Sequence, residues 1–344
     1  MKKLIAYTLL FFLIISVSGS CSVFEKKHTS TSKNTFAEKE KGKLDKNEKK
    51  TGEWKTFDEN KNLYEVISFK NGMMNGDFKR YYKNGKLSET GNYQNNRPVG
   101  EWKEYYESGL LRKFGNYKNG TCVGEWQNYH PNGRVMYIDK FEEDGSQSNG
   151  EWKQYYKNGQ LREIGNYENG TKTGEWKCYH EDGKLFFIGN YEKYRKKGEW
   201  RVYYSNGQLE SIGNYEDDKK TGEWKEYFSS EVVSNKNHNG NLKSIGRYEN
   251  DRNIGEWKYY RWNGVLSSVG NYNKRGKIDE WKEYFENGQL SNTGCYEKNK
   301  QNGEWKFYYE NGQLRLIGNF EDEYKKGEWK YYDEQGNLTK VENY

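Results

Sequence analysis

An eighteen-residue motif, typified by GEWKEYYESGLLRKFGNY at residues 100 to 117, returns with small changes from Gly52 to Tyr344. Its apolar residues fall three apart, which fits neither the period of two of a strand nor the 3.6 of a helix. The period is 24 residues, with two extra residues in the unit at Gly124 and nine in the unit at Gly222. Such copies predict a repeat array rather than separate globular domains. The twelve units begin at Gly52, Gly76, Gly100, Gly124, Gly150, Gly174, Gly198, Gly222, Gly255, Asp279, Gly303 and Gly327.

Each unit has the pattern of a β-hairpin. Aromatic and β-branched residues flank a pair that is usually Asn-Gly, and a polar connection of six residues closes the unit. Glycine at three places in each unit excludes a helix. The aromatic residues, 32 Tyr and 12 Trp among them, supply the apolar surface of a chain whose mean hydropathy is −1.30. The expected fold is all-β, an elongated single-layer array of about twelve antiparallel hairpins.

Two hairpin registers are compatible with the motif. A two-residue loop places Trp152 opposite Gly165, whereas a three-residue loop places Trp152 opposite Ile164 and Tyr155 opposite Leu161. We prefer the three-residue loop, because one unit carries Pro-Asn-Gly there, with glycine where a left-handed residue follows a type I turn.

Residues three apart lie on opposite faces of a strand. We therefore expect Trp152 and Ile164 on one face and Tyr155 and Tyr167 on the other, so that both faces are partly apolar. The recurring glycine, Gly165 in this unit, leaves a bare patch onto which large rings can pack.

The two ends of the array differ from the repeat. The recurring glycine is replaced by Ile67 in the first unit and by Glu342 in the last, and a usual aromatic residue is replaced by Asp58 and Asp333. These substitutions predict end units that cap the open edges of the sheet.

Residues 1–20 have the pattern of an export signal: two lysines, an apolar run, and SGSC ending at Cys21. The run resembles a bacterial lipoprotein signal, which implies that Cys21 carries a lipid after cleavage. The resemblance further implies an exported, membrane-anchored protein at an outer membrane or the cell surface, because Ser22 after the cysteine is similar to the residue of lipoproteins sorted to an outer membrane. Plain secretion after cleavage at the small residues before Cys21 is the alternative.

Residues 21–51 form a predicted Lys-rich flexible tether, and residues 52–344 form the array. Residues 22–50 hold nine lysines against five acidic residues. Beyond residue 50, 46 basic residues balance 46 acidic ones, so the repeats have no electrostatic signature of nucleic-acid binding.

The sequence predicts no enzyme, metal site or cofactor. Repetition of the Glu-Trp pair in eleven units argues for structure, because a catalytic carboxylate pair occupies one site. The remaining cysteines and the histidines lie at scattered positions and predict neither a disulfide framework nor a metal site; they are Cys122, Cys178, Cys295, His28, His130, His180 and His238.

GEWKxYYxNGxLxxxGNY resembles the MORN-repeat variant, and in particular the repeat of YwqK-type antitoxin proteins. The resemblance covers residues 52–344 and implies a hairpin scaffold that binds a partner. It also implies an antitoxin or immunity role against a toxin, although the export signal departs from a cytosolic antitoxin. A third possibility is a cell-wall or glycan binder, in which aromatic residues cage a ligand between hairpins.

We expect a protein partner first, contacted where the repeat is broken. Trp262 occupies a hairpin loop, and Tyr194 and Tyr324 stand in connections, so these exposed aromatics are candidate contacts. The nine-residue insertion, which includes Ser229 and His238, is another candidate, and its structural alternative is a tolerated loop expansion.

Overall fold

A computed structural model describes residues 39–229 and 240–344. These residues form strands and turns, and no helix among them is long and apolar enough to span a membrane. The strands are β1 (Lys39–Leu44), β2 (Lys50–Phe57), β3 (Leu63–Lys70), β4 (Met73–Tyr81), β5 (Leu87–Gln94), β6 (Arg97–Tyr105), β7 (Leu111–Lys118), β8 (Thr121–Tyr129), β9 (Val135–Phe141), β10 (Gly150–Tyr155), β11 (Leu161–Glu168), β12 (Thr171–Tyr179), β13 (Leu185–Glu192), β14 (Arg195–Tyr203), β15 (Leu209–Glu216), β16 (Lys219–Tyr227), β17 (Leu242–Glu249), β18 (Arg252–Tyr260), β19 (Leu266–Asn273), β20 (Gly276–Tyr284), β21 (Leu290–Glu297), β22 (Lys300–Tyr308), β23 (Leu314–Glu321), β24 (Tyr324–Tyr332) and β25 (Leu338–Asn343).

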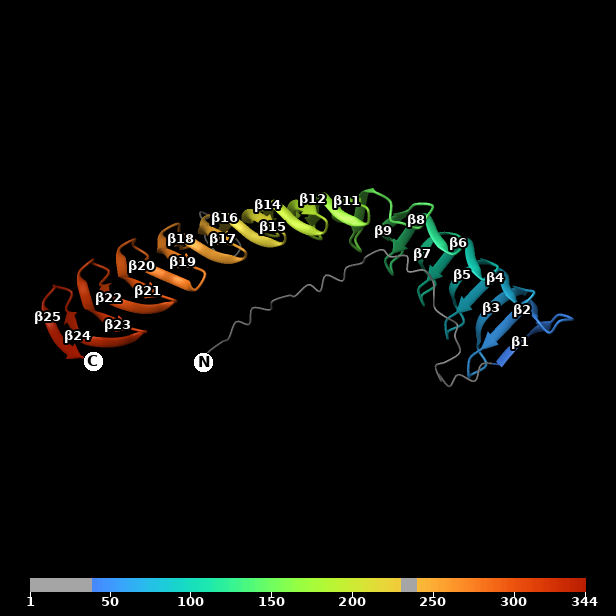
Figure 1. Cartoon of the computed structure of the whole chain (residues 1–344), viewed down its shortest axis with the longest axis horizontal. Coiled ribbons are helices and arrows are strands. Elements are labelled where there is room, and N and C mark those ends of the chain that lie inside the picture. Colours follow the sequence, from blue (N-terminus) through green and yellow to red (C-terminus); the bar gives the residue numbers. More distant parts are fainter. Residues whose placement is uncertain (1–38, 230–239) are drawn as a thin grey trace. The chain divides into compact units, whose positions relative to one another are not determined.

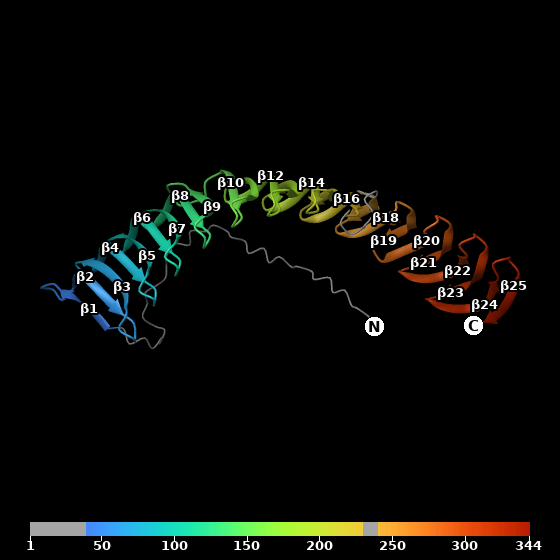
Figure 2. The same ribbon diagram turned by 180° about the vertical axis from the view of Figure 1, so that it is seen from behind.

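The chain divides into two units, Met1–Gly150 with Glu168–Gly170, and Glu151–Tyr167 with Thr171–Tyr344. Within each unit the strands pair antiparallel in chain order, as Figure 1 shows and Figure 2 shows from behind. The described residues contain twelve repeat hairpins, from β2–β3 to β24–β25. The expected all-β, single-layer array of hairpins is confirmed.

The hairpin loop has three residues, as expected. In the hairpin of β6 and β7, the N–H of Tyr106 donates to the carbonyl of Leu110 and the N–H of Gly109 to that of Tyr106, both at 2.8 Å. Gly109 has a φ of 94°, the left-handed conformation that closes such a loop. Beyond the loop a bulge shifts the register by one residue, so that Trp102 faces Gly115. The expected pairing of tryptophan with the residue before that glycine is therefore wrong.

The connections between hairpins are themselves tight turns. Asn95 and Asn96, between β5 and β6, have φ values of 48° and 65°, and two consecutive left-handed residues define a type I′ turn. The six polar residues that close each unit in the sequence therefore belong mostly to paired strands.

The flexible tether expected to extend to residue 51 is wrong for its last part, because Lys39–Leu44 forms strand β1 and pairs with β2. Gly42 explains this strand. The ring of Trp54 covers Gly42, at which an added Cβ would lie 2.2 Å from the indole, and Trp54 Nε1 donates to the carbonyl of Lys43 at 3.2 Å. β1 is therefore half of a repeat that the motif does not reveal.

The bulged register also changes the assignment of faces. The rings of Trp102 and Tyr117 meet edge to face with centroids 5.5 Å apart, and those of Trp152 and Tyr167 at 5.9 Å. The motif's Trp and its closing Tyr thus share one face, and the expectation of opposite faces is wrong. We call this side of each sheet the Trp face.

Ile67 and Glu342, which replace the recurring glycine in the first and last repeats, have different roles. Ile67 lies inside the sheet between Trp54 and Phe78, and the smaller Phe78 ring replaces tryptophan there, so Ile67 belongs to a compensated pair and is not a cap. Glu342 lies on β25 opposite Trp329, and its carboxylate accepts from the hydroxyl of Tyr344 at 2.6 Å.

Candidate binding surface

The repeated unit of packing is a tryptophan laid flat on a glycine of the preceding strand. An added Cβ at Gly213 would lie 2.2 Å from Trp224 Cδ2, so only glycine leaves room for this ring. Trp224 Nε1 donates to the carbonyl of Asn214 at 3.1 Å. The first residue of the motif, Gly222, has a φ of +66° and belongs to the bulge that lets the ring cross over.

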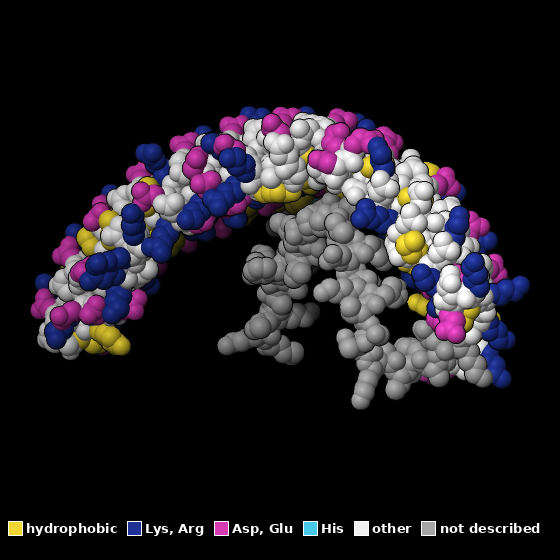
Figure 3. Space-filling model, turned by 45° about the vertical axis from the view of Figure 1, so that its right-hand side comes forward, with side chains coloured by type: hydrophobic (Ala, Val, Ile, Leu, Met, Phe, Trp, Pro, Cys, Tyr) yellow, Lys and Arg dark blue, Asp and Glu magenta, His cyan; other side chains and the backbone are white. Residues whose placement is uncertain are grey.

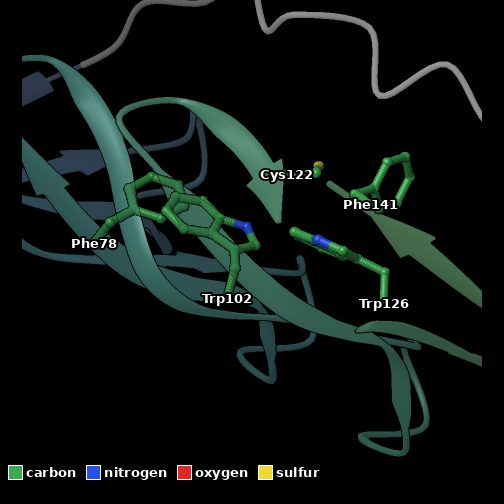
Figure 4. Close-up of a cluster of buried hydrophobic side chains, with 5 residues drawn as sticks. All are labelled: Phe78, Trp102, Cys122, Trp126 and Phe141. Atoms are coloured by element: carbon green, nitrogen blue, oxygen red, sulfur yellow. The ribbon is translucent and has the colours of Figure 1, made fainter. Parts of the chain in front are cut away.

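These tryptophans form the core. Nine of them are at most 4% exposed: Trp102, Trp126, Trp176, Trp200, Trp224, Trp257, Trp281, Trp305 and Trp329. The rings of neighbouring tyrosines stand perpendicular to them, as for Tyr215 and Trp224 at 5.1 Å. In Figure 4 the ring of Phe78 lies against that of Trp102, the two being stacked at 5.2 Å. A single-layer sheet therefore buries its large rings between strands rather than beneath a second layer.

A lysine covers seven of the tryptophan rings in the described residues. Lys196 Nζ lies 4.7 Å from the ring centroid of Trp200 and 4.8 Å from that of Tyr215, and the other such lysines are Lys50, Lys113, Lys172, Lys220, Lys277 and Lys325. Burial lowers the pKa of Lys196 and of Lys220. The aromatic cages are thus filled by the chain's own ammonium groups, which argues against stacking of an external glycan on these rings.

The hairpin loops are tied together from unit to unit. The hydroxyl of Tyr204 donates to the carbonyl of Tyr227 at 2.7 Å, and Asn287 Nδ2 donates to that of Glu310 at 3.1 Å, each 23 residues ahead. The same tyrosine bond recurs from Tyr82, Tyr106, Tyr156 and Tyr309. The loop edge is therefore a structural ladder.

One line of residues on the Trp face varies from unit to unit while its neighbours repeat. It consists of the residue two positions after each motif Trp and the residue two positions before each recurring glycine. These residues pair across successive strands, and we call the line that they form the column. In the first of the two compact units, Met1–Gly150, the column is Glu40, Thr56, Glu65, Arg80, Glu89, Glu104, Lys113, Asn128 and Tyr137. In the second unit, from β12 onward, it is Cys178, Phe187, Val202, Ser211, Glu226, Ser244, Tyr259, Ser268, Glu283, Asn292, Phe307, Leu316, Tyr331 and Lys340.

The column of the first unit is mainly charged. Arg80 donates from Nη2 to Glu65 and from Nη1 to Glu89, each at 2.7 Å, and Trp102 Nε1 donates to Glu89 at 2.9 Å. Burial raises the pKa of Glu89, although Arg80 and Trp102 oppose that rise. The charged groups of Glu65, Arg80 and Glu89 thus pair with one another.

The column of the second unit is more apolar. Phe187 lies 5.3 Å from the Trp200 ring, and Tyr259 and Phe307 stack on Trp257 and Trp305 at 5.8 and 5.9 Å. Phe187, Val202, Phe307, Leu316 and Tyr331 are all half-buried, and so keep part of their surface in solvent. Aromatic and aliphatic side chains at non-repeated, accessible positions are suited to recognition of a protein.

The opposite face repeats the same ion pair in nearly every unit. Lys225 Nζ lies 3.0 Å from Glu223, and Lys258 Nζ lies 3.0 Å from Glu256. Figure 3 shows basic and acidic side chains interspersed along the visible surface. Exposed pairs of this kind contribute little stability, and their sameness offers no unit-specific recognition.

The predicted contact residues are dispersed. Trp262 is 39% exposed at the loop edge, whereas Tyr194, 44% exposed, and Tyr324, 79% exposed, lie at the edge of the connections. Tyr194 and Tyr324 are ten strands apart, about 48 Å at the usual strand spacing. Ser229 is 7% exposed and so is a poor contact, and Cys21 and His238 lie outside the described residues. Sequence reasoning missed the column, although its variation between repeated neighbours could have revealed it.

Among residues 39–229 and 240–344, no group of three His, Cys, Asp or Glu side chains could hold a metal ion. Cys178 and Cys295 are free thiols within strands, as their positions in the sequence suggest, and burial raises the pKa of Cys178 to about 11. His180 Nε2 lies 3.3 Å from the carbonyl of Tyr203 and takes the place of a loop-ladder tyrosine.

Comparisons with solved structures find only weak likeness. A crystal structure of TcdB2-TccC3 is 12% identical over 84% of this chain and 18% of that chain, with a TM-score of 0.18. A structure of the Photorhabdus luminescens Tc holotoxin pore is 13% identical over 83% and 18%, with a TM-score of 0.17. The chain thus spans less than a fifth of these chains, and likeness at this level supports no conclusion. No curated protein matches the sequence.

The model of the MORN repeat variant matches ten segments: residues 50–71, 74–95, 98–119, 123–143, 148–169, 172–193, 196–217, 280–298, 301–322 and 325–344. It leaves out residues 218–279, where the hairpin of β18 and β19 nevertheless places Trp257 opposite Gly270 as elsewhere. The match covers more than half of the chain and coincides with the hairpins described above. The chain therefore belongs to the MORN repeat variant family.

Proposed function

We propose that this protein is a non-enzymatic, exported binding scaffold whose partner is another protein. MORN repeats commonly mediate binding to proteins or membranes, and the family is the general support for this proposal. The observation that carries it is the column, because the other repeated positions of the Trp face are occupied by packing. Its half-buried apolar side chains in the second unit, such as Phe187 and Phe307, are the surface that differs from one unit to the next.

We also propose that the scaffold is anchored through a lipid on Cys21. The support is the sequence alone: two lysines, an apolar run and small residues before the cysteine. Metabolic labelling with a fatty-acid analogue should mark the wild-type protein and fail for Cys21→Ala. A Cys21→Ala protein that is still labelled would refute the anchor, and an unlabelled wild type in the medium would indicate plain secretion.

The test of protein binding is photo-crosslinking in the native cell. A photoreactive residue replaces Phe307 in the column in one variant and Ile317, next to the recurring Gly318 and on the opposite face, in the control. We expect a discrete crosslinked protein from position 307 and none from 317. Equal products from both positions would refute recognition through the column.

Two experiments separate the alternatives that the sequence left open. Crosslinks from position 307 to wall polymer alone would favour a glycan binder, which the lysine-filled cages argue against. Rescue of growth by a signal-less chain against a toxin encoded nearby would favour the antitoxin role of YwqK-type proteins.

A further inference from the structure

Five residues on β13 to β16 and in the turn between β13 and β14 form a patch that differs from the rest of the Trp face. Phe187 and Val202 pair in the column, Lys196 and Lys220 lie over the tryptophans of adjacent units, and Tyr194 lies two residues before Lys196. We call these five residues the Lys196 patch.

The two lysines of the patch lack an ion-pair partner. Lys172, one unit earlier, pairs with Glu163 at 2.8 Å, but no described carboxylate lies within ion-pair distance of Lys196 or Lys220. Burial lowers the pKa of both lysines, and the charge of Lys220, about 10 Å away across two strands, lowers the pKa of Lys196 further. An anionic group placed between the two lysines would stabilise both of their partly buried charges.

The surroundings of the lysines are apolar on the loop side. The column there holds Phe187, Val202 and Ser211, and the next carboxylate along it is Glu226 on β16. Asp218 attracts Lys196, and Glu226 and Asp251 attract Lys220, without forming ion pairs. The carboxylates of Asp218 and Asp251 accept the backbone N–H groups of Lys196 and Lys220 at 2.8 and 2.7 Å. The patch thus joins two cations to a pair of half-buried apolar side chains.

Tyr194 supplies a second, independent observation. It occupies the second position of a type I′ turn with a φ of 69°, where equivalent turns carry Asn96, Gly120 or Asp218. A tyrosine is unfavourable in the left-handed region, so its presence costs stability that asparagine would not. Its ring is 44% exposed and lies 6.3 Å from that of Tyr167 on the Trp face. A strained, exposed aromatic residue, two positions before Lys196 in the chain, is typical of a contact residue.

We propose that the Lys196 patch binds an acidic segment of a partner protein. Carboxylates of the segment pair with Lys196 and Lys220, neighbouring apolar side chains pack on Phe187 and Val202, and Tyr194 contacts the edge of the segment. This assignment rests on the proposed function, since it names the chemistry of the partner that the scaffold recognises.

The test uses the purified full chain and a display library of random peptides of about 20 residues, long enough to span the patch whether extended or helical. Selected peptides should be enriched in Asp and Glu next to apolar residues. Their affinity should fall about tenfold or more in the variant Lys196→Gln/Lys220→Gln. The matched control, Lys225→Gln/Lys258→Gln, removes the same charge from the opposite face and should change affinity less than twofold.

A second variant separates recognition from folding. Tyr194→Asn restores the usual residue of the turn, so the melting temperature should hold or rise while affinity for the selected peptides falls several-fold. Unchanged affinity in Tyr194→Asn would remove Tyr194 from the site.

The outcomes distinguish the two proposals. Selected peptides without acidic enrichment, or acidic peptides unaffected by Lys196→Gln/Lys220→Gln, would overturn the patch while leaving protein binding intact. A library that yields no binder would refute protein recognition itself. Phosphatidylserine vesicles are the second probe, and binding to them through these lysines, without acidic peptides, would overturn the partner class.

Discussion

Replacing Gly213 by alanine tests the packing unit on which the whole array depends. The added Cβ would lie 2.2, 2.3 and 2.5 Å from three ring atoms of Trp224, closer than real contacts allow. Gly213 does not have a left-handed backbone, so alanine meets no strain of its own there. The loss of stability in Gly213→Ala therefore measures only the packing of the Trp224 ring on Gly213, which we call the seat of the ring.

The expected cost follows from what the ring loses. To reach an ordinary contact near 3.4 Å, Trp224 must move away by roughly 1.2 Å, the difference between 3.4 and 2.2 Å. Overpacking of this kind costs about 1–3 kcal/mol. The 3.1 Å hydrogen bond from Trp224 Nε1 to Asn214 would stretch or break, which adds about 1 kcal/mol. We expect Gly213→Ala to destabilise its hairpin by about 2–4 kcal/mol.

Hydrogen exchange is the appropriate assay, because repeat arrays can unfold in parts and a single melting curve then averages over units. Amide protection should drop in β15 and β16. The matched control is Gly222→Ala, at a φ of +66° with open space around the new Cβ, where only backbone strain of about 1 kcal/mol is added. Equal loss of protection in the two variants would refute the seat.

One repeat of the chain already combines a larger residue at the glycine position with a smaller ring. Ile67 sits where other units have glycine, and the ring that meets it is Phe78. The double variant Gly213→Ile/Trp224→Phe should therefore be more stable than Gly213→Ile alone, and the coupling between the two sites should exceed about 1 kcal/mol. Simple additivity of the two substitutions would contradict direct ring-to-glycine contact.

Three further tests concern the turns and the tyrosines. Burial raises the pKa of Tyr93 and Tyr248 to about 12 from 10.0, so their stabilisation is complete below pH 10 and should be lost as pH rises toward 12; urea melts that do not change over this range would contradict it. Asp279 has a φ of 57° where other units have glycine, so Asp279→Gly should raise the free energy of unfolding in urea by up to about 1 kcal/mol. Tyr204→Phe removes the bond to Tyr227 and should cost about 0.5–1.5 kcal/mol, with faster amide exchange in the adjoining loops as the readout.

The hairpins, the three-residue loop and the packing of rings on the recurring glycine follow from the sequence, because Asn-Gly turns and glycine gaps are local features. The bulge does not follow, since it depends on how Gly222 and Trp224 cross the preceding strand. Strand β1 was missed because Gly42 lies twelve residues before Trp54, and because the segment around Gly42 lacks the aromatic residues of the motif. These features depend on contacts between strands that no single motif contains.

Part of the candidate surface was also accessible to sequence reasoning. The exposure of Trp262, Tyr194 and Tyr324 was expected, since aromatics at turn positions cannot enter the core. That Lys196 and Lys220 have no ion-pair partner among the described residues could not be expected, because they occupy the same motif position as lysines that cap rings elsewhere. The distinction lies in their neighbours, because Phe187 and Ser211 stand at the column positions equivalent to Glu163, the carboxylate that pairs with Lys172.

The division of labour between repeated and varied positions explains how one fold could present many specificities. Trp200 and Gly189 form a seat that needs no contribution from the side chains of Phe187 and Val202 beyond contact at their edges. A substitution in the column therefore changes what the Trp face offers while leaving the seat and the loop ladder in place. Stability is then a property of each unit and its neighbours, whereas recognition is a property of the order in which column residues follow one another along the sheet. By this reasoning, the variant Phe187→Lys/Val202→Asn, which introduces the residue types of the column positions Lys113 and Asn128, should preserve folding and abolish recognition at the Lys196 patch.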